Sequence, residues 1–395
     1  MRPLATPYSN AAYTPRRGAH TASLNDIGEF LHGSFHPQRL ITEEIMQLYS
    51  PASRWSSSLC LTLALWGVSC TLLAHNLYDL PVGTILNFGP NLQTAVGGIC
   101  RQPEGLAIDP DGNFYLASNS DSATTVGHVC VIDAKGNLVD IIDVPAGPGA
   151  AAIGLVGELW EGGHLYVLDQ ADNIVPHGRI LRINPRTHEV TTVHDGLAFP
   201  NGMAEDRHGN LYVTDSLLGV IYRFSENDPT LVKWFQSPML LSNNPDQNVG
   251  ANDLAFDADE RYLYVDNAGN RQVMRIPLDS KGNPGAIELF ADGASLDRQL
   301  GLPTPTALFF ADGMQFDVKG NLYVMANITN EIEVFSPSGS LIHRYAGTGN
   351  NAFSFNASPV FKGRLMFITN MSATDGGVNS KLSVFVAPYR GLRTK

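Results

Sequence analysis

The chain has 395 residues, enough for one large domain or two of ordinary size. Hydrophobic residues make up 44% and charged residues 16%, which is typical of a globular protein and excludes a largely disordered one. The formal net charge of −12 argues against nucleic acid as a partner, since nucleic acid binds basic patches, whereas an acidic protein is a suitable host for a cation.

The first predicted element is an apolar segment near the N-terminus. Residues 1–58 show no hydrophobic period, so we interpret them as an unstructured leader or a misassigned start site. Residues 59–74 contain no charge; they are short for a membrane span of about 20 residues and typical of a signal-peptide core. A start at Met46 would give an ordinary signal peptide over 46–74. A cleaved signal predicts a secreted or periplasmic protein, an uncleaved one a membrane anchor, and a buried helix is the third interpretation.

The cysteines do not form a disulfide framework. Cys60 and Cys70 lie in the apolar segment, which leaves Cys100 and Cys130 for the remaining chain. One bridge between these two fits an exported protein, and two buried thiols fit the sequence equally well.

Six similar segments then follow, each centred on a strand of the type Gly-x-Leu-Tyr. They start at residues 112, 163, 209, 261, 320 and 363, at steps of 43 to 59 residues. A short strand precedes most of them, and a third and usually a fourth strand follow. Four short strands in a unit of about 50 residues are typical of a propeller blade. We therefore predict an all-β fold, a six-bladed β-propeller over residues 80–390.

The last unit predicts how the propeller closes. It has only three clear strands before the chain ends, while the strand at residues 83–89 precedes the first unit and has no partner there. We predict that this N-terminal strand supplies the outer strand of blade six, because an open ring of blades would leave unpaired edges.

Chemistry is expected where the first strand of each blade begins, because these points converge on the central tunnel. Four blades place a polar residue there: Glu104, Asn201, Asn252 and Asp312, called the tunnel set below. Blade two offers Ile153 or a neighbour, and blade six offers residues 356–358. Taken singly, the Asn-Gly and Asp-Gly pairs suit turns. Taken together, two carboxylates and two amides suit a hard cation, Ca²⁺ or alternatively Mg²⁺ or Mn²⁺, and the absence of His and Cys disfavours zinc and copper.

The ordered motifs PEG, PNG, AND and ADG, at spacings of 97, 51 and 60 residues, carry a family resemblance. Over about residues 80–395 the chain resembles the SMP-30/gluconolactonase/regucalcin-like (LRE) six-bladed propellers, and more distantly the paraoxonases and diisopropyl-fluorophosphatase. The resemblance implies that the tunnel set holds a catalytic divalent cation. It also implies hydrolysis of a lactone or related ester, with the metal polarising the carbonyl and Asp312 acting as general base or nucleophile.

The chain departs from the paraoxonase-like pattern, in which a tunnel histidine of an early blade acts as base. His177, in a loop of blade two, is our candidate for that role, and His128 has a comparable place in blade one; both also suit ordinary surface positions. Asp253 is expected either to support the tunnel set or to cap its strand. The long connections 237–250 and 291–310 are either ordinary loops or an apolar lid that favours a hydrophobic ester over a bare sugar lactone.

Two other function classes remain open at this point. One is a metal-free enzyme similar to strictosidine synthase, and the other is a non-catalytic NHL-like binding propeller with a structural metal. The leading hypothesis is a lactonase or esterase, expected to be a monomer that binds a small-molecule lactone or ester. It would bind no nucleic acid and keep no stable membrane span in its mature form.

Overall fold

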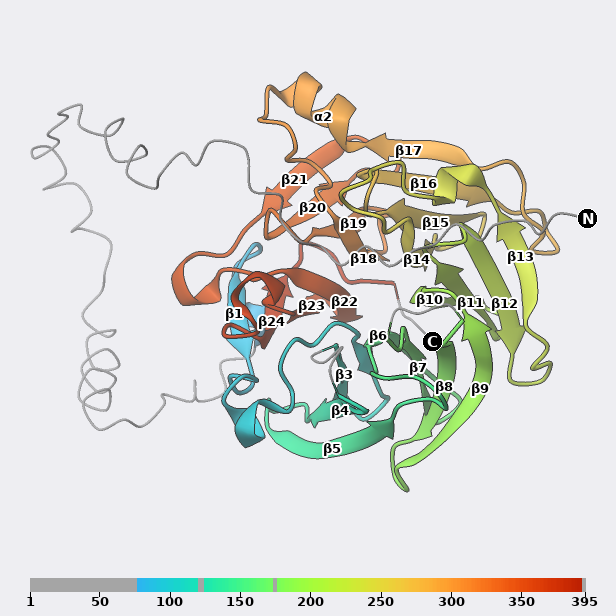
Figure 1. The fold of residues 1–395 in the computed structure, drawn as a ribbon. Helices are drawn as coiled ribbons and strands as arrows, with labels where there is room; N and C mark the ends of the chain where they lie inside the picture. The colour runs from blue at the N-terminus through green and yellow to red at the C-terminus, as the bar shows by residue number, and fades with distance from the viewer. Residues whose placement is uncertain (1–76, 120–123, 173–175, 393–395) are drawn as a thin grey trace, which may run out of the picture. The chain divides into compact units, whose positions relative to one another are not determined.

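The computed structural model describes residues 77–119, 124–172 and 176–392, so the predicted leader and the apolar segment 59–74 lie outside it. The described chain forms six four-stranded antiparallel sheets arranged around a centre, a six-bladed β-propeller (Figure 1). The predicted fold class is confirmed. In five blades the four strands follow one another in the chain and pair in that order from the tunnel outward.

Blades one to three comprise, in chain order, β2 (Ala107–Ile108), β3 (Phe114–Ser118), β4 (Val126–Ile132) and β5 (Leu138–Pro145); β6 (Leu155–Glu161), β7 (His164–Asp169), β8 (Gly178–Asn184) and β9 (Glu189–Leu197); β10 (Pro200–Glu205), β11 (Asn210–Asp215), β12 (Val220–Ser225) and β13 (Val232–Gln236). Blades four and five comprise β14 (Ala251–Phe256), β15 (Tyr262–Asn267), β16 (Gln272–Pro277) and β17 (Glu288–Asp292); β18 (Ala311–Phe316), β19 (Leu322–Ala326), β20 (Glu331–Phe335) and β21 (Leu341–Tyr345).

Blade six closes the propeller as predicted. It contains β22 (Asn356–Lys362), β23 (Leu365–Asn370) and β24 (Lys381–Val386), and its outer strand is β1 (Ile85–Phe88) from the beginning of the described chain. β1 pairs antiparallel with β24, which satisfies the edge that β24 would otherwise expose. The one α-helix of the described residues, α2 (Gly293–Leu300), lies in the connection between blades four and five.

The hairpin between the first two strands carries the same side-chain network in three blades. In blade three the Asp206 carboxylate accepts hydrogen bonds from the backbone and side-chain nitrogens of Asn210 and from the Tyr212 hydroxyl, at 2.9, 2.7 and 3.1 Å. Asp109 and Asp317 make the same contacts in blades one and five. The repeated Gly-Asn-x-Tyr pattern therefore encodes a buried hydrogen-bond network at the turn. The tyrosine of this pattern belongs to the core, as expected.

Packing between adjacent blades is apolar, and one disulfide ties the segment before blade one to that blade. The second strands bury their Leu and Val side chains almost completely, as Leu116, Val167 and Val324 illustrate. Cys100 and Cys130 form a disulfide that ties the segment before blade one to β4, which decides between the two interpretations of these cysteines. None of the helices among the described residues has the length and apolarity needed to cross a membrane.

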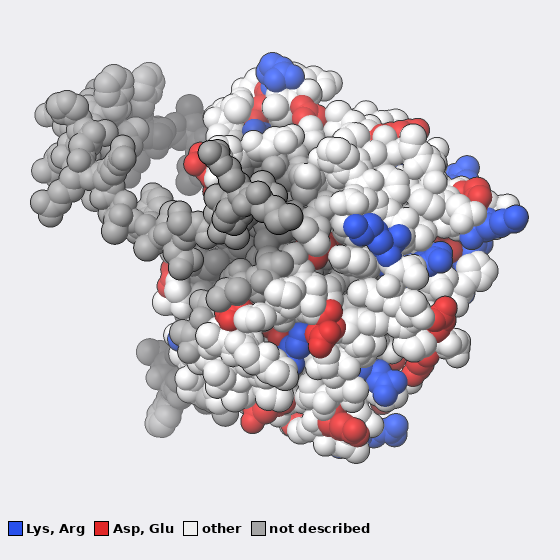
Figure 2. Space-filling model, turned by 45° about the vertical axis from the view of Figure 1, so that its right-hand side comes forward, with Lys and Arg blue, Asp and Glu red and all other residues white. Residues whose placement is uncertain are grey.

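The charged side chains show no gathering of a single sign on the face drawn in Figure 2. Lysine and arginine side chains there lie among aspartate and glutamate side chains instead of forming one extended basic patch.

Candidate metal centre

Five of the six first strands carry a β-bulge at the end where they enter the tunnel. In blade three the pairing register shifts between Pro200 and Met203, so that Asn201 and Gly202 together face one position of β11. The same shift occurs in blades two, four, five and six, and blade one has a matching gap after Pro103. A bulge changes the direction of a side chain locally, so these positions are equivalent around the tunnel.

The first bulge residue identifies what each blade contributes to the tunnel. In blade order these residues are Glu104, Val156, Asn201, Asn252, Asp312 and Ala357. All four members of the tunnel set are buried, with 3 to 6% of their surface exposed. The structure therefore places them at one common position in four blades. Blade two contributes Val156, three residues after the expected Ile153, and blade six contributes Ala357, within the expected range 356–358.

The Asn201–Gly202 pair is not a turn, contrary to the simplest interpretation of its sequence. Both residues lie inside β10, and Gly202 is not among the glycines with positive φ. A Cβ on Gly202 would lie 2.4 Å from the backbone oxygen of Asn252 in the next blade. Three further glycines meet the bulge residue of the following blade in the same way, at 2.2 to 2.4 Å: Gly105, Gly157 and Gly313. Close approach of neighbouring blades explains these glycines.

Amide groups orient the Asp312 carboxylate of the tunnel set. Nδ2 of Asn252 donates to Oδ1 of Asp312 at 2.9 Å, and Nδ2 of Asn327 donates to Oδ2 of the same carboxylate at 2.7 Å. Nδ2 of Asn201 donates to the Ser216 hydroxyl at 3.2 Å. Because both amide nitrogens of the tunnel set act as donors, the carbonyl oxygens of Asn201 and Asn252 are the atoms left to coordinate a cation.

Glu104 is the electrostatically unsatisfied member of the tunnel set. Its Oε2 atom is buried without a hydrogen-bond partner among the described residues. Burial, followed by the charges of Asp312, Asp253 and Glu158, raises the pKa of Glu104 well above its usual value. Burial also raises the pKa of Asp312 to about 6, opposed by the hydrogen bonds from Asn327 and Asn252. Converging carboxylates of this kind are what a bound cation would neutralise.

The donor set of the tunnel fits a hard divalent cation. It offers two carboxylates and two amide oxygens, which are ligands that Ca²⁺ accepts, and one carboxylate oxygen without a partner. Among the residues that the structure describes, no three His, Cys, Asp or Glu side chains group together as a metal site. The tunnel set contains only two residues of those types, so that finding concerns a different kind of site.

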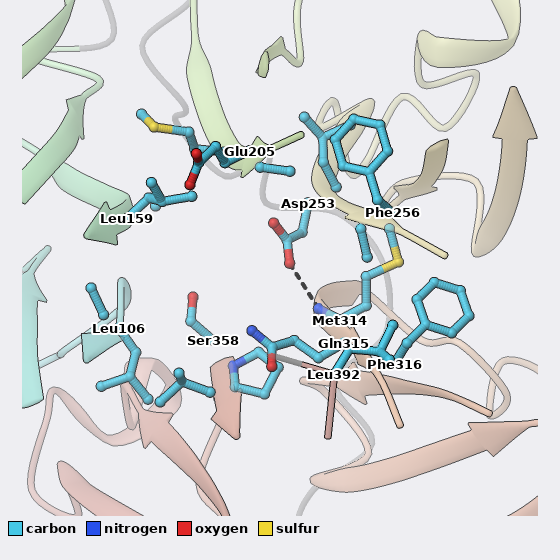
Figure 3. A pocket seen from close by; sticks show the side chains of 18 of the residues that line it. Leu106, Leu159, Glu205, Asp253, Phe256, Met314, Gln315, Phe316, Ser358 and Leu392 are labelled. Atoms are coloured by element: carbon cyan, nitrogen blue, oxygen red, sulfur yellow. Dashed lines mark hydrogen bonds between the residues drawn. The ribbon is translucent and has the colours of Figure 1, made fainter. Parts of the chain in front are cut away.

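Asp253 links blades four and five instead of capping its own strand. Its Oδ2 atom accepts a hydrogen bond from the backbone nitrogen of Met314 at 2.8 Å, drawn as the dashed line in Figure 3. Burial raises the pKa of Asp253 to about 7. Its own backbone nitrogen donates to Oδ1 of Asp266 at 2.6 Å, and burial raises the pKa of Asp266 well above the usual range.

Glu158 is a buried carboxylate that sequence reasoning missed. Its Oε1 atom accepts from the backbone nitrogen of Ala117 at 3.1 Å, Oε2 has no partner among the described residues, and burial raises its pKa to about 8. The sequence places the tunnel position of blade two at Ile153 or a neighbour, several residues before the acidic residue of GELW, so Glu158 is not among the predicted site residues. Asp266 could also have been identified from the sequence, because this acidic residue occupies the second-strand position at which blade three has Thr214.

A cavity of about 260 Å³ occupies the tunnel along the first strands (Figure 3). Its wall is mixed: Leu106, Leu159 and Phe256 are among the apolar side chains, and Glu205, Asp253 and Gln315 are among the polar ones. Its lining residues on the first strands come after the first bulge residue of each strand, and no member of the tunnel set lines it.

The histidine candidates lie in polar pairs of their own. Nδ1 of His177 lies 2.9 Å from Oδ1 of Asp172, and its side chain is 30% exposed. His128 pairs in the same way with the exposed Asp143. No hydrogen bond joins either histidine to the tunnel set among the described residues, and a catalytic role for His177 stays a prediction.

The comparisons with known proteins agree with the sequence motifs. Residues 239–372 match the model of the SMP-30/Gluconolactonase/LRE-like region. A gluconolactonase of Zymomonas mobilis subsp. mobilis is 25% identical over 334 residues, which cover 75% of this chain and 86% of that protein.

Three solved structures share the fold. They are a luciferin-regenerating enzyme (TM-score 0.54, 14% identity, 74% of this chain and 94% of that one), a gluconolactonase from Xanthomonas campestris (0.52, 16%, 78% and 99%) and the calcium-binding protein regucalcin from Agrobacterium tumefaciens (0.51, 15%, 73% and 92%). The resemblance inferred from the sequence motifs is confirmed: this propeller carries an SMP-30/gluconolactonase/LRE-like region.

Proposed function

We propose that the protein is a divalent-metal-dependent hydrolase of a lactone or related ester, with Ca²⁺ or another hard cation held by Glu104, Asn201, Asn252 and Asp312. The observation that carries this proposal is the shared position of the four side chains at the tunnel bulge of four blades. The gluconolactonase relative supports the lactone class, and the calcium-binding regucalcin supports the metal.

Asp312 is the residue best placed for proton transfer. Its pKa of about 6 leaves it mainly ionised at neutral pH, so it can accept a proton from an attacking water or itself attack the carbonyl carbon. Asn252 and Asn327 each donate to one of its two oxygens, which fixes the plane of the carboxylate. When bound, the cation would polarise the carbonyl group of the substrate and stabilise the negative charge that develops on its oxygen.

The test is a metal titration of chelator-stripped protein against a panel of sugar lactones, alkyl lactones and aryl esters. We expect hydrolysis to require Ca²⁺, Mg²⁺ or Mn²⁺ and to be lost in Asp312→Asn and Glu104→Gln. His177→Ala, outside the tunnel set, measures the contribution of the alternative base. Activity and stability that are both indifferent to EDTA would overturn the proposal. If a metal stabilises the fold but Asp312→Ala loses no activity on any substrate of the panel, the result would instead favour a binding propeller.

We also propose that the protein acts after export, as a monomer. The Cys100–Cys130 disulfide supports an oxidising compartment, and the apolar segment 59–74 supplies a candidate signal. A fusion of residues 46–80 to an export-dependent reporter tests the first point, and light scattering of the mature protein tests the second. A cytosolic reporter or an oligomer in solution would contradict the respective part.

A further inference from the structure

The residue two positions before each bulge residue forms a second layer at the same end of the tunnel. In blade order this layer consists of Gln102, Gly154, Phe199, Gly250, Phe310 and Phe355. Two residues of chain span at most about 7 Å, so each Cα lies no farther than that from the Cα of its bulge residue. The three phenylalanines are half-buried, and none of them packs into the six core clusters of the described chain. The apolar surface of these three side chains therefore does not contribute to the core of any blade.

Two of these phenylalanines have a strained backbone. Phe310 has a φ of 55° and Phe355 a φ of 53°, in the left-handed region that is rare for a bulky side chain. Strain of this kind persists only where surrounding contacts enforce it, and it concentrates at ligand sites. No core packing explains it here, since the two side chains lie outside the clusters.

A single loop enforces both conformations. In the β19–β20 connection, the backbone nitrogen of Asn327 donates to the backbone oxygen of Phe310 at 3.2 Å, and the side-chain oxygen of Asn330 accepts from the backbone nitrogen of Phe355. The two aromatic rings, from blades five and six, then lie with centroids 6.1 Å apart at an interplanar angle of 47°. The pair, called the aromatic wall below, is a tilted wedge and not a flat platform.

The aromatic wall is tied to Asp312 through Asn327. The side chain of Asn327 donates to Oδ2 of Asp312, while its backbone holds Phe310. The position of the wall is thus fixed relative to the carboxylate that the proposed reaction uses.

Resting on the proposed function, we infer that the aromatic wall of Phe310 and Phe355 binds the non-reacting part of the substrate and selects an alkyl- or aryl-substituted lactone or ester over a polyhydroxylated sugar lactone. An alkyl chain gains free energy when it leaves water for this surface. Sugar hydroxyls placed against the rings would lose water partners without replacement, because the wall offers no side-chain donor or acceptor.

The test compares kcat/KM for an alkyl-substituted δ-lactone and for glucono-δ-lactone. The variants are the wild type, the double variant Phe310→Ala/Phe355→Ala, and Phe235→Ala, a half-buried phenylalanine on the outer strand β13 that packs against a core cluster. We expect the wild type to prefer the alkyl lactone. In the double variant this preference falls roughly tenfold, mainly through KM, as expected when apolar contacts are lost. Phe235→Ala keeps the preference, and thermal melting verifies that each variant folds.

Calorimetric binding of the matching alkyl δ-lactam, which is not hydrolysed, measures the wall independently of catalysis. A wild type that prefers glucono-δ-lactone, or equal lactam affinity in wild type and double variant, would overturn the inference. If the double variant fails to fold, Phe355→Leu replaces it and must show a smaller loss in the same direction. Lactam binding that depends on the wall, without hydrolysis of any lactone, would overturn the proposed function and leave the wall as a ligand site.

Discussion

The two ends of the first strands both bury carboxylates, and they differ in how well those carboxylates are satisfied. At the hairpin end, Asp109, Asp206 and Asp317 each accept backbone, amide and phenol hydrogen bonds. At the tunnel end, Glu104 and Glu158 each keep one buried oxygen without a partner among the described residues. Satisfied carboxylates stabilise a fold, whereas buried carboxylates short of partners mark a site prepared for a ligand.

The largest expected effect is on kcat/KM, which a substitution at the tunnel end should lower far more than a substitution at the hairpin end. Asp312→Ala should lower kcat/KM for the best lactone by at least about 10³-fold, because it removes a proposed metal ligand and the proposed base together. Asp206→Ala, at the hairpin end, should leave kcat/KM within about threefold under conditions where the variant is folded. Steady-state kinetics at saturating metal give both numbers, and equal losses in the two variants would refute the contrast.

The buried Glu158 carboxyl at the tunnel end should make the free energy of unfolding depend on pH. Its folded-state pKa of about 8 lies above the unfolded value of 4.5, so the folded state retains a proton that the unfolded state has released. The free energy of unfolding should therefore fall as pH rises from about 4.5 to 8, by about 4 kcal/mol from this group. Glu158→Gln should remove this part of the slope and stabilise the protein at pH 8.5 but not at pH 4.5. Urea titrations across this range measure it, and a slope unchanged in the variant would contradict it.

Two glycines, one at each end, test why glycine is needed. Gly202→Ala should destabilise the protein by about 3 kcal/mol, since its Cβ would meet the Asn252 oxygen at 2.4 Å and the Asp253 Cα at 2.6 Å. Gly209→Ala should cost only about 1 kcal/mol, because a Cβ on this hairpin glycine would make only an ordinary contact, with Oε1 of Glu205 at 3.9 Å, and the main cost is a φ of 81° that alanine tolerates poorly. Equal losses in urea unfolding would show that blade contact is not the cause at Gly202.

The last comparison concerns the hairpin end alone. Asp206→Ala leaves the Tyr212 hydroxyl and the Asn210 amide without their acceptor and should lower the free energy of unfolding by about 2 kcal/mol. The affinity for Ca²⁺ should not change. Calorimetry of metal binding is the control, and a weakened affinity in this variant would mean that the two ends are coupled.

The sequence predicted the fold and its closure well because both depend on local strand patterns that recur six times. It also predicted the four polar bulge residues, since their blades repeat the same motif. Taken singly, the Asn201–Gly202 pair suggests a turn, and this is wrong, because the atom that requires the glycine, the Asn252 oxygen, belongs to another blade. The strained Phe310 and Phe355 could not be predicted either, because a backbone angle enforced by Asn327 and Asn330 leaves no mark in the local sequence.

The measurement that tests the account most directly is a crystal structure of the protein grown with millimolar Ca²⁺, with a parallel Mn²⁺ soak for anomalous scattering. The account predicts one metal peak in the tunnel, with oxygens of Glu104, Asn201, Asn252 and Asp312 at about 2.3–2.6 Å for Ca²⁺. A tunnel without anomalous density would contradict it.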